Sequence, residues 1–324
     1  MKIRPVILCG GAGTRLWPDF KKHQVKQFID FGGWNLFGKA LERINNSSFD
    51  EPIISTNSKY LREVKQNLKK NKINKYKIIL EPVKKNTGPA ILVSALIKEI
   101  PNNQPLIFFT ADHLIEKSGT FNRELKKNIK HLNKENIFIF GIKPSLPSNQ
   151  FGYFITKKNK NLNKVNRFIE KPNKNKAKQL IKKGGYWNSG IFFARKDSII
   201  NNFRKYQKII YRNSLKAVSK SKFKNNTYYL DKNSFNHNPS KSFDYSILEK
   251  TKNINAVKLN ISWSDLGSWK EILLMFNKNK YKYFKKKNIF YKPWGSYVNL
   301  FKGKNFLEKE LKIKPKGVLS LQKH

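Results

Sequence analysis

The feature that most restricts the fold of this chain is an alternation of short apolar runs with segments of helical spacing. Apolar runs at residues 6–9 and 106–109 have the length of buried strands, and after a loop each is followed by apolar residues at three- and four-residue intervals. This alternation favours right-handed βαβ units and a mostly parallel, Rossmann-like α/β sheet. Ligands of such sheets bind at the carboxyl ends of the strands. We therefore expect functional residues directly after the strands.

The same pattern predicts the order of the elements. Strands are expected over residues 6–9, 52–56, 77–80, 106–109 and 137–141, and helices over 34–44, 59–70, 89–99 and 121–132. From Phe151 the strands become shorter and more aromatic, which indicates a smaller subdomain with strands at 151–155, 165–169 and 186–194 and helices at 174–183 and 197–217.

The composition limits the classes of function. The formal net charge is +46, and a strongly basic chain can bind nucleic acid or anionic membranes through phosphate contacts. However, lysines are spread along the whole chain, and no helix-turn-helix, zinc-finger or RNP pattern is present. We expect no specific nucleic-acid partner, although an inactive basic protein that associates with nucleic acid is the rival hypothesis.

The sequence also indicates the compartment. No apolar run approaches the 18 residues of a membrane span, and the N-terminus leads directly into the first strand. The single cysteine, Cys9, excludes an intramolecular disulfide and a CxxC metal site, and a buried core position suits it best. A cytoplasmic protein without membrane contact is expected.

A glycine-rich turn follows the first strand. Gly10, Gly11 and Gly13 allow the backbone to turn sharply and to present N–H groups to a phosphate, and Arg15 and Lys26 add cationic donors. The third glycine of a dinucleotide fingerprint is replaced by leucine, and the G-K-[ST] of a P-loop is absent. A turn without any ligand is the alternative.

The wider string, Gly10-Gly11-x-Gly13-Thr14-Arg15-Leu-Trp-Pro followed by Lys26-Gln-Phe, resembles the signature of sugar-1-phosphate nucleotidyltransferases, in particular the mannose-1-phosphate guanylyltransferase branch. The loop over residues 81–90 resembles the family's E-P-x-x-R-N-T-x-P-A loop beside the nucleotide, with Lys85 in place of arginine. The resemblance implies a nucleotide site formed by Gly10, Gly11, Gly13, Thr14, Arg15, Lys26, Lys85, Asn86 and Thr87. Alternatively, Thr87 is only the N-cap of a helix.

Two aspartates are candidate metal ligands. Asp112 follows the strand at 106–109, where a carboxylate facing a phosphate loop is well placed to hold Mg²⁺; an Asx-turn is the alternative. The stretch Trp263-Ser-Asp265-Leu-Gly-Ser-Trp269 resembles a second guanylyltransferase segment. The resemblance implies that Asp112 and Asp265 hold the cofactor Mg²⁺ together, and that Arg15, Lys26, Asp112 and Asp265 are the catalytic residues.

The sugar-phosphate site is implied by three further matches. The segment Asn149-Gln-Phe-Gly152-Tyr resembles the family's sugar-side loop with two residues altered, and Phe168-Ile-Glu170-Lys171-Pro matches F-x-E-K-P. Glu170 and Asn188 can bind sugar hydroxyls, and Lys171 can neutralise the sugar phosphate. The alternative for the stretch around Asn188 is a strand with a bulge at Gly190.

We expect a nucleotidyltransferase domain over 1–275, a charged linker over 276–290, and a tail over 291–324 that resembles the start of the cupin domain of bifunctional isomerase–guanylyltransferases. With His324 as its one candidate ligand, the tail is not expected to have isomerase activity.

The implied reaction joins GTP and α-D-mannose 1-phosphate to give GDP-mannose and pyrophosphate, a precursor for bacterial surface polysaccharide. The same fold with another base or sugar is the alternative. A homodimer is compatible with the sequence, which does not determine the oligomeric state.

Overall fold

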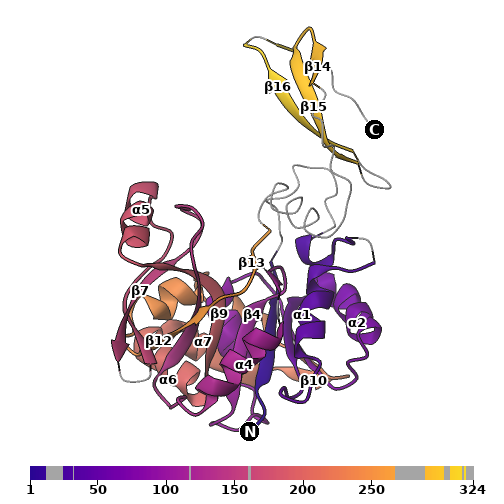
Figure 1. The fold of residues 1–324 in the computed structure, drawn as a ribbon. Helices are drawn as coiled ribbons and strands as arrows, with labels where there is room; N and C mark the ends of the chain where they lie inside the picture. The colour runs from indigo at the N-terminus through magenta and orange to yellow at the C-terminus, as the bar shows by residue number, and fades with distance from the viewer. Residues whose placement is uncertain are drawn as a thin grey trace. The chain divides into compact units, whose positions relative to one another are not determined.

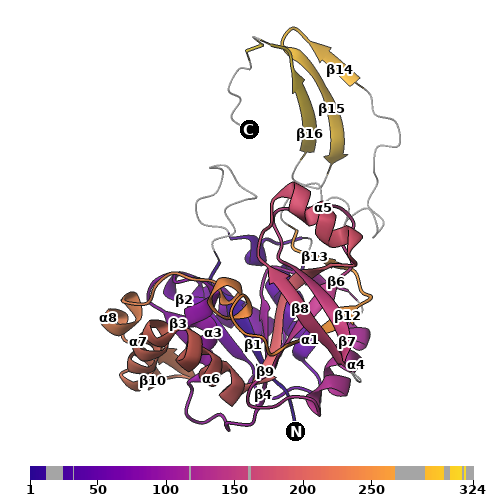
Figure 2. The ribbon, with the colours of Figure 1, turned by 90° about the vertical axis from the view of Figure 1, so that its left-hand side faces the viewer.

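The computed structural model describes residues 1–11, 25–31, 33–116, 118–159, 162–266, 289–302, 307–315 and 317–318. The chain forms two compact units, Met1–Asp265 and Leu266–His324. In the described residues of the first unit, one eleven-stranded sheet runs in the order β10-β11-β3-β2-β1-β4-β9-β6-β12-β8-β7 (Figures 1 and 2). Its strands are β1 (Arg4–Cys9), β2 (Ile53–Asn57), β3 (Lys77–Glu81), β4 (Pro105–Thr110), β6 (Ile137–Ile142), β7 (Tyr153–Asn159), β8 (Leu162–Ile169), β9 (Tyr186–Arg195), β10 (Lys222–Lys224), β11 (Thr227–Tyr229) and β12 (Ile254–Leu259).

The strands that lead into the predicted nucleotide-binding and metal-binding residues pair in parallel, as expected. β1 pairs in parallel with both β2 and β4, β2 pairs in parallel with β3, and β11 continues this parallel set at β3. β9 then lies between β4 and β6, antiparallel to both. The strands expected in a smaller subdomain therefore continue the main sheet, because β9 also pairs with β7.

Helices bury both faces of this sheet. Alternation along β1 sends Val6 and Leu8 into one apolar core and Ile7 and Cys9 into the other. The first core is closed by α3 (Thr87–Ala95), α6 (Lys196–Tyr206), α7 (Lys208–Ser219) and the π-helix η4 (Asp244–Leu248), and the second by α1 (Leu36–Ile44), α2 (Leu61–Lys70), α4 (Ser118–Ile129) and α5 (Lys174–Lys182). The remaining short helices are η2 (Lys26–Phe28), η3 (Ser58–Tyr60) and α8 (Lys232–Asn236). The predicted α/β class is confirmed.

Three helix predictions need correction. The helix expected over 121–132 is α4, which begins and ends earlier, at Ser118 and Ile129. The helix expected over 89–99 is α3, which begins and ends earlier, at Thr87 and Ala95. The single helix expected over 197–217 is two helices, because Gln207 (φ −141°, ψ 60°) leaves the helical region between α6 and α7. Its side chain donates instead to the backbone carbonyl of Ser246, at 2.8 Å.

The second unit contains an antiparallel sheet of β14 (Ile289–Lys292), β15 (Gly295–Lys302) and β16 (Leu307–Ile313). The rings of Phe290 and Trp294 each stack on Tyr297. Residues 276–288 of the expected linker, and His324, lie outside the described residues, and residues 289–290 of that linker belong to β14. Within the described residues, no helix has both the length and the apolarity needed to cross a bilayer.

Candidate active site

The parallel pairing of β1 with β4 brings two strand ends to one edge of the sheet. Leu8 of β1 is in register with Thr110 of β4, so the segments that follow, Gly10-Gly11 and Ala111-Asp112, leave the sheet side by side. Asp265 arrives there through a second, two-stranded sheet, in which β13 (Trp263–Ser264) pairs antiparallel with β5 (Leu114–Ile115). Because Ser264 pairs with Leu114, Asp265 lies beside the residues that precede β5.

Lys26 joins the two predicted metal ligands. Its ammonium nitrogen lies 3.2 Å from Oδ2 of Asp112 and also donates to the backbone carbonyl of Asp265. The lysine side chain is only 6% exposed, whereas that of Asp112 is 33% exposed. Burial raises the pKa of Asp112, but the neighbouring His113 and Lys26 outweigh it and hold that pKa below its usual range. Three of the four residues predicted to be catalytic thus meet at this point; Arg15, with Gly13 and Thr14, lies outside the described residues.

Gln27 and Phe28 fix the position of Lys26. The Gln27 amide donates to the backbone carbonyl of Gly11 at 3.2 Å, which ties η2 to the glycine turn. The Phe28 ring packs against Phe37 of α1 and Tyr60 of η3. The resemblance of the Lys26-Gln27-Phe28 motif assigned no role to Gln27. A polar residue between a lysine and an aromatic residue was the sequence signal for this anchoring role.

His113, the residue after Asp112, contacts both Asp112 and Trp263. Its Nε2 lies 3.8 Å from Oδ1 of Asp112, and its ring packs edge-to-face on Trp263. Burial lowers the pKa of His113 below its ordinary value against the opposing effect of Asp112.

Glu81, at the end of β3, is the first residue of the loop over 81–90, and its sequence motif assigned it no role of its own. Its carboxylate is buried, accepts a hydrogen bond from the Ser55 hydroxyl at 2.8 Å, and would lie 3.6 Å from a Cβ placed on Gly10. Burial raises its pKa to about 7. An acidic residue closing an otherwise apolar strand was the sequence signal.

The loop after Glu81 corrects one local prediction. The N-cap of α3 is Asn86 and not Thr87: the Asn86 side chain accepts from the Thr87 N–H at 2.9 Å with the backbone at φ 67°. Thr87 instead accepts from the N–H of Phe243 through its hydroxyl, at 2.9 Å. Asn86 is exposed and Lys85 is half-buried, and among the described residues Lys85 forms no ion pair.

The four predicted sugar-side residues lie together. The backbone carbonyl of Gly152 accepts from the N–H of Asn188 at 2.8 Å, and a Cβ on Gly152 would lie 2.5 Å from Oε2 of Glu170. Lys171 holds the other oxygen of that carboxylate at 3.4 Å. Lys171 adopts a left-handed backbone (φ 46°), a strained conformation of the kind that persists where the surrounding structure enforces it.

Two more carboxylates, which the sequence analysis did not assign, complete this end of the site. Asp244 accepts from the Asn188 amide at 2.8 Å, and Glu249 accepts from the backbone N–H of Glu170 at 3.2 Å. Burial, reinforced by Asp244, raises the pKa of Glu170 to about 7, and burial raises that of Asp244 to about 6. Asp244 and Glu249 lie on or directly after η4. The stretch that contains them, residues 243–251, resembles a guanylyltransferase segment in its sequence, but that resemblance assigned neither carboxylate a role.

Aromatic rings connect the phosphate end of the site, around Lys26 and Asp112, with its sugar end, around Glu170 and Asn188. Trp263 contacts both His113 and Phe151, and Phe151 in turn packs on Trp187 of β9. The predicted bulge in β9 is present, because the register with β6 shifts between Ile139 and Gly141 and Gly190 has φ 73°. A Cβ on Gly190 would lie 3.4 Å from the His113 ring. The bulge therefore brings β9 against the Asp112 loop.

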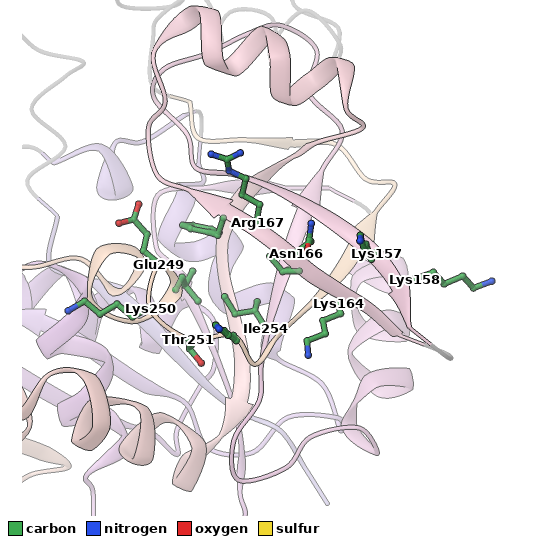
Figure 3. A pocket seen from close by; sticks show the side chains of 13 residues that line it. Lys157, Lys158, Lys164, Asn166, Arg167, Glu249, Lys250, Thr251 and Ile254 are labelled. Atoms are coloured by element: carbon green, nitrogen blue, oxygen red, sulfur yellow. The ribbon is translucent and has the colours of Figure 1, made fainter.

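A separate basic groove of about 770 Å³ lies between the β7–β8 hairpin and residues 248–254 (Figure 3). Its lining includes Lys157, Lys164, Arg167, Lys250 and Lys252, and none of the predicted site residues. Glu249 is the residue it shares with the sugar-side cluster.

Comparison with known proteins places this geometry in a family. Residues 4–281 match the nucleotidyl transferase family, and residues 277–324 match the family of mannose-6-phosphate isomerase C-terminal domains. Since the first match covers most of the chain, the protein belongs to the nucleotidyl transferase family.

Individual relatives are more specific. The chain is 34% identical over 280 residues to a mannose-1-phosphate guanylyltransferase of Salmonella montevideo, and 32% identical over 276 residues to the alginate biosynthesis protein AlgA of Pseudomonas aeruginosa. Each match covers 83% of this chain but only 59% and 57%, respectively, of the relative. Among solved structures, a mannose-6-phosphate isomerase from Helicobacter pylori is 29% identical with a TM-score of 0.71, covering 82% of this chain and 100% of that one.

Proposed function

We propose that the protein transfers a guanylyl group from GTP to α-D-mannose 1-phosphate, giving GDP-mannose and pyrophosphate, with Mg²⁺ as cofactor. The observation that carries the proposal is the meeting of Lys26, Asp112 and Asp265 beside the Gly10-Gly11 turn. The names of the relatives from Salmonella and Pseudomonas support it.

The donor set suits magnesium. Mg²⁺ is commonly held by one or two carboxylates together with substrate phosphates. Asp112 offers an ionised and partly exposed carboxylate, and Asp265 stands beside it. When bound there, the ion would neutralise phosphate charge during the transfer.

The reaction needs positioning and charge neutralisation and no covalent enzyme intermediate. A phosphate oxygen of the sugar phosphate attacks the α-phosphorus in line; the bond from that phosphorus to the bridging oxygen breaks, and pyrophosphate leaves. Backbone N–H groups of the glycine turn, Arg15 and Lys26 bind the triphosphate. Lys171 neutralises the sugar phosphate, and its exposed side chain leaves the ammonium accessible.

Glu81 favours guanine over other bases. Guanine presents its N1–H and N2–H₂ donors side by side, and the two oxygens of a carboxylate can accept from both. Uracil and thymine present one donor between two acceptors, a pattern that a carboxylate does not match. Because Glu81 is buried against Gly10, a base that leaves it unpaired would meet a desolvated carboxylate.

Glu170, Asn188 and Asp244 suit a sugar ring. Glu170 and Asp244 are acceptors for hydroxyl hydrogens, and the Asn188 amide can donate and accept. The Asn188–Asp244 hydrogen bond and the packing of Glu170 over Gly152 hold these groups in place before a ligand arrives.

The test is a steady-state assay of GTP, dTTP and UTP with mannose 1-phosphate and glucose 1-phosphate. We expect the highest kcat/KM for GTP with mannose 1-phosphate. Glu81→Gln should lower kcat/KM for GTP about 10- to 100-fold, the range for a lost hydrogen bond to a charged group. Glu99→Gln is the matched control, because Glu99 also accepts from a hydroxyl, that of Tyr228 at 2.6 Å. Strong turnover of dTTP with glucose 1-phosphate and none of GTP would refute the proposal.

A further inference from the structure

The lysines in the described ion pairs differ in how deeply their side chains are buried. The Lys39, Lys127 and Lys171 side chains are 39%, 62% and 46% exposed, whereas that of Lys26 is 6% exposed. Lys26 also contacts the two residues that the proposed function assigns to the metal. An ammonium that is buried in this way holds the negative charge of Asp112 without any metal.

We infer that Lys26 is the resident counter-ion of the metal site: its ammonium stays with Asp112 and Asp265 until a divalent cation and a nucleoside triphosphate arrive together. This inference rests on the proposed function. Two cations at one carboxylate repel each other, and the repulsion is strong where little water separates them. A divalent cation that enters alone must therefore compete with Lys26.

The nucleotide removes this conflict. Its triphosphate adds negative charge beside the glycine turn, and this charge can accept the ammonium that the metal displaces. Binding of the metal and binding of the triphosphate then strengthen each other by the same factor, as linkage requires. The lysine thus disfavours occupation of the site by a metal ion without its nucleotide.

The local structure allows the side chain to move while its backbone stays fixed. Gln27 and Phe28 anchor η2 through Gly11, Phe37 and Tyr60. A lysine stem with four methylene groups can redirect its ammonium by rotation about its own bonds.

The experiment measures Mn²⁺ binding to the purified full chain by electron paramagnetic resonance, without nucleotide and with GTP. Lys26→Met should bind Mn²⁺ without nucleotide at least tenfold more tightly than the wild type, and GTP should strengthen its Mn²⁺ binding less. Lys26→Arg, which keeps the cation, should stay within about threefold of the wild type. Lys127→Met, which removes an exposed ion-paired lysine, is the matched control and should not change the affinity.

Each result decides the inference. Unchanged or weaker nucleotide-free Mn²⁺ binding by Lys26→Met overturns it, and Lys26→Gln gives a second neutral variant if the methionine variant does not fold. Asp112→Asn should abolish the tight binding that Lys26→Met gains; tight binding that survives this change places the ion elsewhere and also overturns the inference. Failure of the proposed function gives a different result. In that case the protein does not transfer a guanylyl group in the steady-state assay, although its Mn²⁺ binding still depends on Lys26.

Discussion

The phosphate end and the sugar end of the site shift the pKa values of their carboxylates in opposite directions. At the phosphate end, Lys26 and His113 hold the pKa of Asp112 below its ordinary range. At the sugar end, burial raises the pKa of Glu170 to about 7 and that of Asp244 to about 6. The same chemical group is therefore kept charged at one end, whereas at the other end it gains or loses its proton close to neutral pH.

The difference comes from the basic groups at each end, which are His113 and Lys26 beside Asp112 and Lys171 beside Glu170. The Lys26 side chain is 6% exposed and contacts both aspartate residues, so little water screens its charge. Lys171 is 46% exposed and stands against Glu170, which has Asp244 and Glu249 as neighbours. One screened cation does not offset the desolvation of several carboxylates.

The largest expected effect is a loss of turnover when the carboxylates of the phosphate end are removed. Asp112→Asn removes the charge that would hold the cation, and so does Asp265→Asn; each should lower kcat about 10²- to 10³-fold, as for a lost charge-assisted contact in a transition state. Asp50→Asn is the matched control, because Asp50 is similarly exposed (34%) and pairs with Arg4 at 2.6 Å. Turnover that survives both site substitutions in a guanylyl-transfer assay would rule out the two-aspartate site.

The next effect concerns the geometry of the sugar end. In Gly152→Ala the new Cβ meets Oε2 of Glu170 at 2.5 Å, and the end of this side chain can shift without unfolding the protein. We expect the KM for mannose 1-phosphate to rise about tenfold, corresponding to about 1.4 kcal/mol, while the KM for GTP stays constant. Gly119→Ala is the control, since no described atom lies within 4 Å of its Cβ position. Equal changes in both KM values would show that Gly152 does not act on the sugar end alone.

A smaller effect is a pH dependence of sugar binding. Since Glu170 accepts hydroxyl hydrogens best when ionised and its pKa is about 7, the KM for mannose 1-phosphate should fall severalfold between pH 6 and pH 8. In Glu170→Gln, the KM for mannose 1-phosphate should fall less over this pH range, because only the ionisation of the sugar phosphate still contributes to the fall. Identical pH profiles of kcat/KM for the variant and the wild type would contradict the role of Glu170.

The smallest effect is on stability. The folded pKa of Glu170 lies above its ordinary value of 4.5, so its contribution to stability is complete below pH 4.5 and is lost as the pH rises through 7. Glu170→Gln should remove this dependence and stabilise the protein at pH 8 by on the order of 1 kcal/mol relative to pH 5. Urea unfolding at the two pH values measures the change, and Glu124→Gln on the exposed face of α4 is the comparison variant. The raised pKa would be contradicted if the free energy of unfolding of the wild type, measured relative to that of Glu170→Gln, increased from pH 5 to pH 8.

Sequence patterns were sufficient for the local structure and for the family. Apolar runs predicted β1, β2, β3, β4 and β6 within a residue or two, and the motifs around Gly10, Asp112, Glu170 and Asp265 indicated the nucleotidyl transferase family that the comparison confirms. Local errors arose where a tertiary contact decided the outcome. Thr87 is not the N-cap, because its hydroxyl binds Phe243 from a segment more than 150 residues away.

The sequence by itself determined which residues carry charge and hydrogen-bonding groups, and at which strand ends they stand, because strand and helix periods are local properties. The tertiary structure alone decided which of them meet. Lys26 and Asp265 are 239 positions apart and come together only through the β13–β5 pairing and the anchored η2. The opposite pKa shifts at the two ends are likewise tertiary, because burial and the distance to a lysine determine whether a carboxylate keeps its charge.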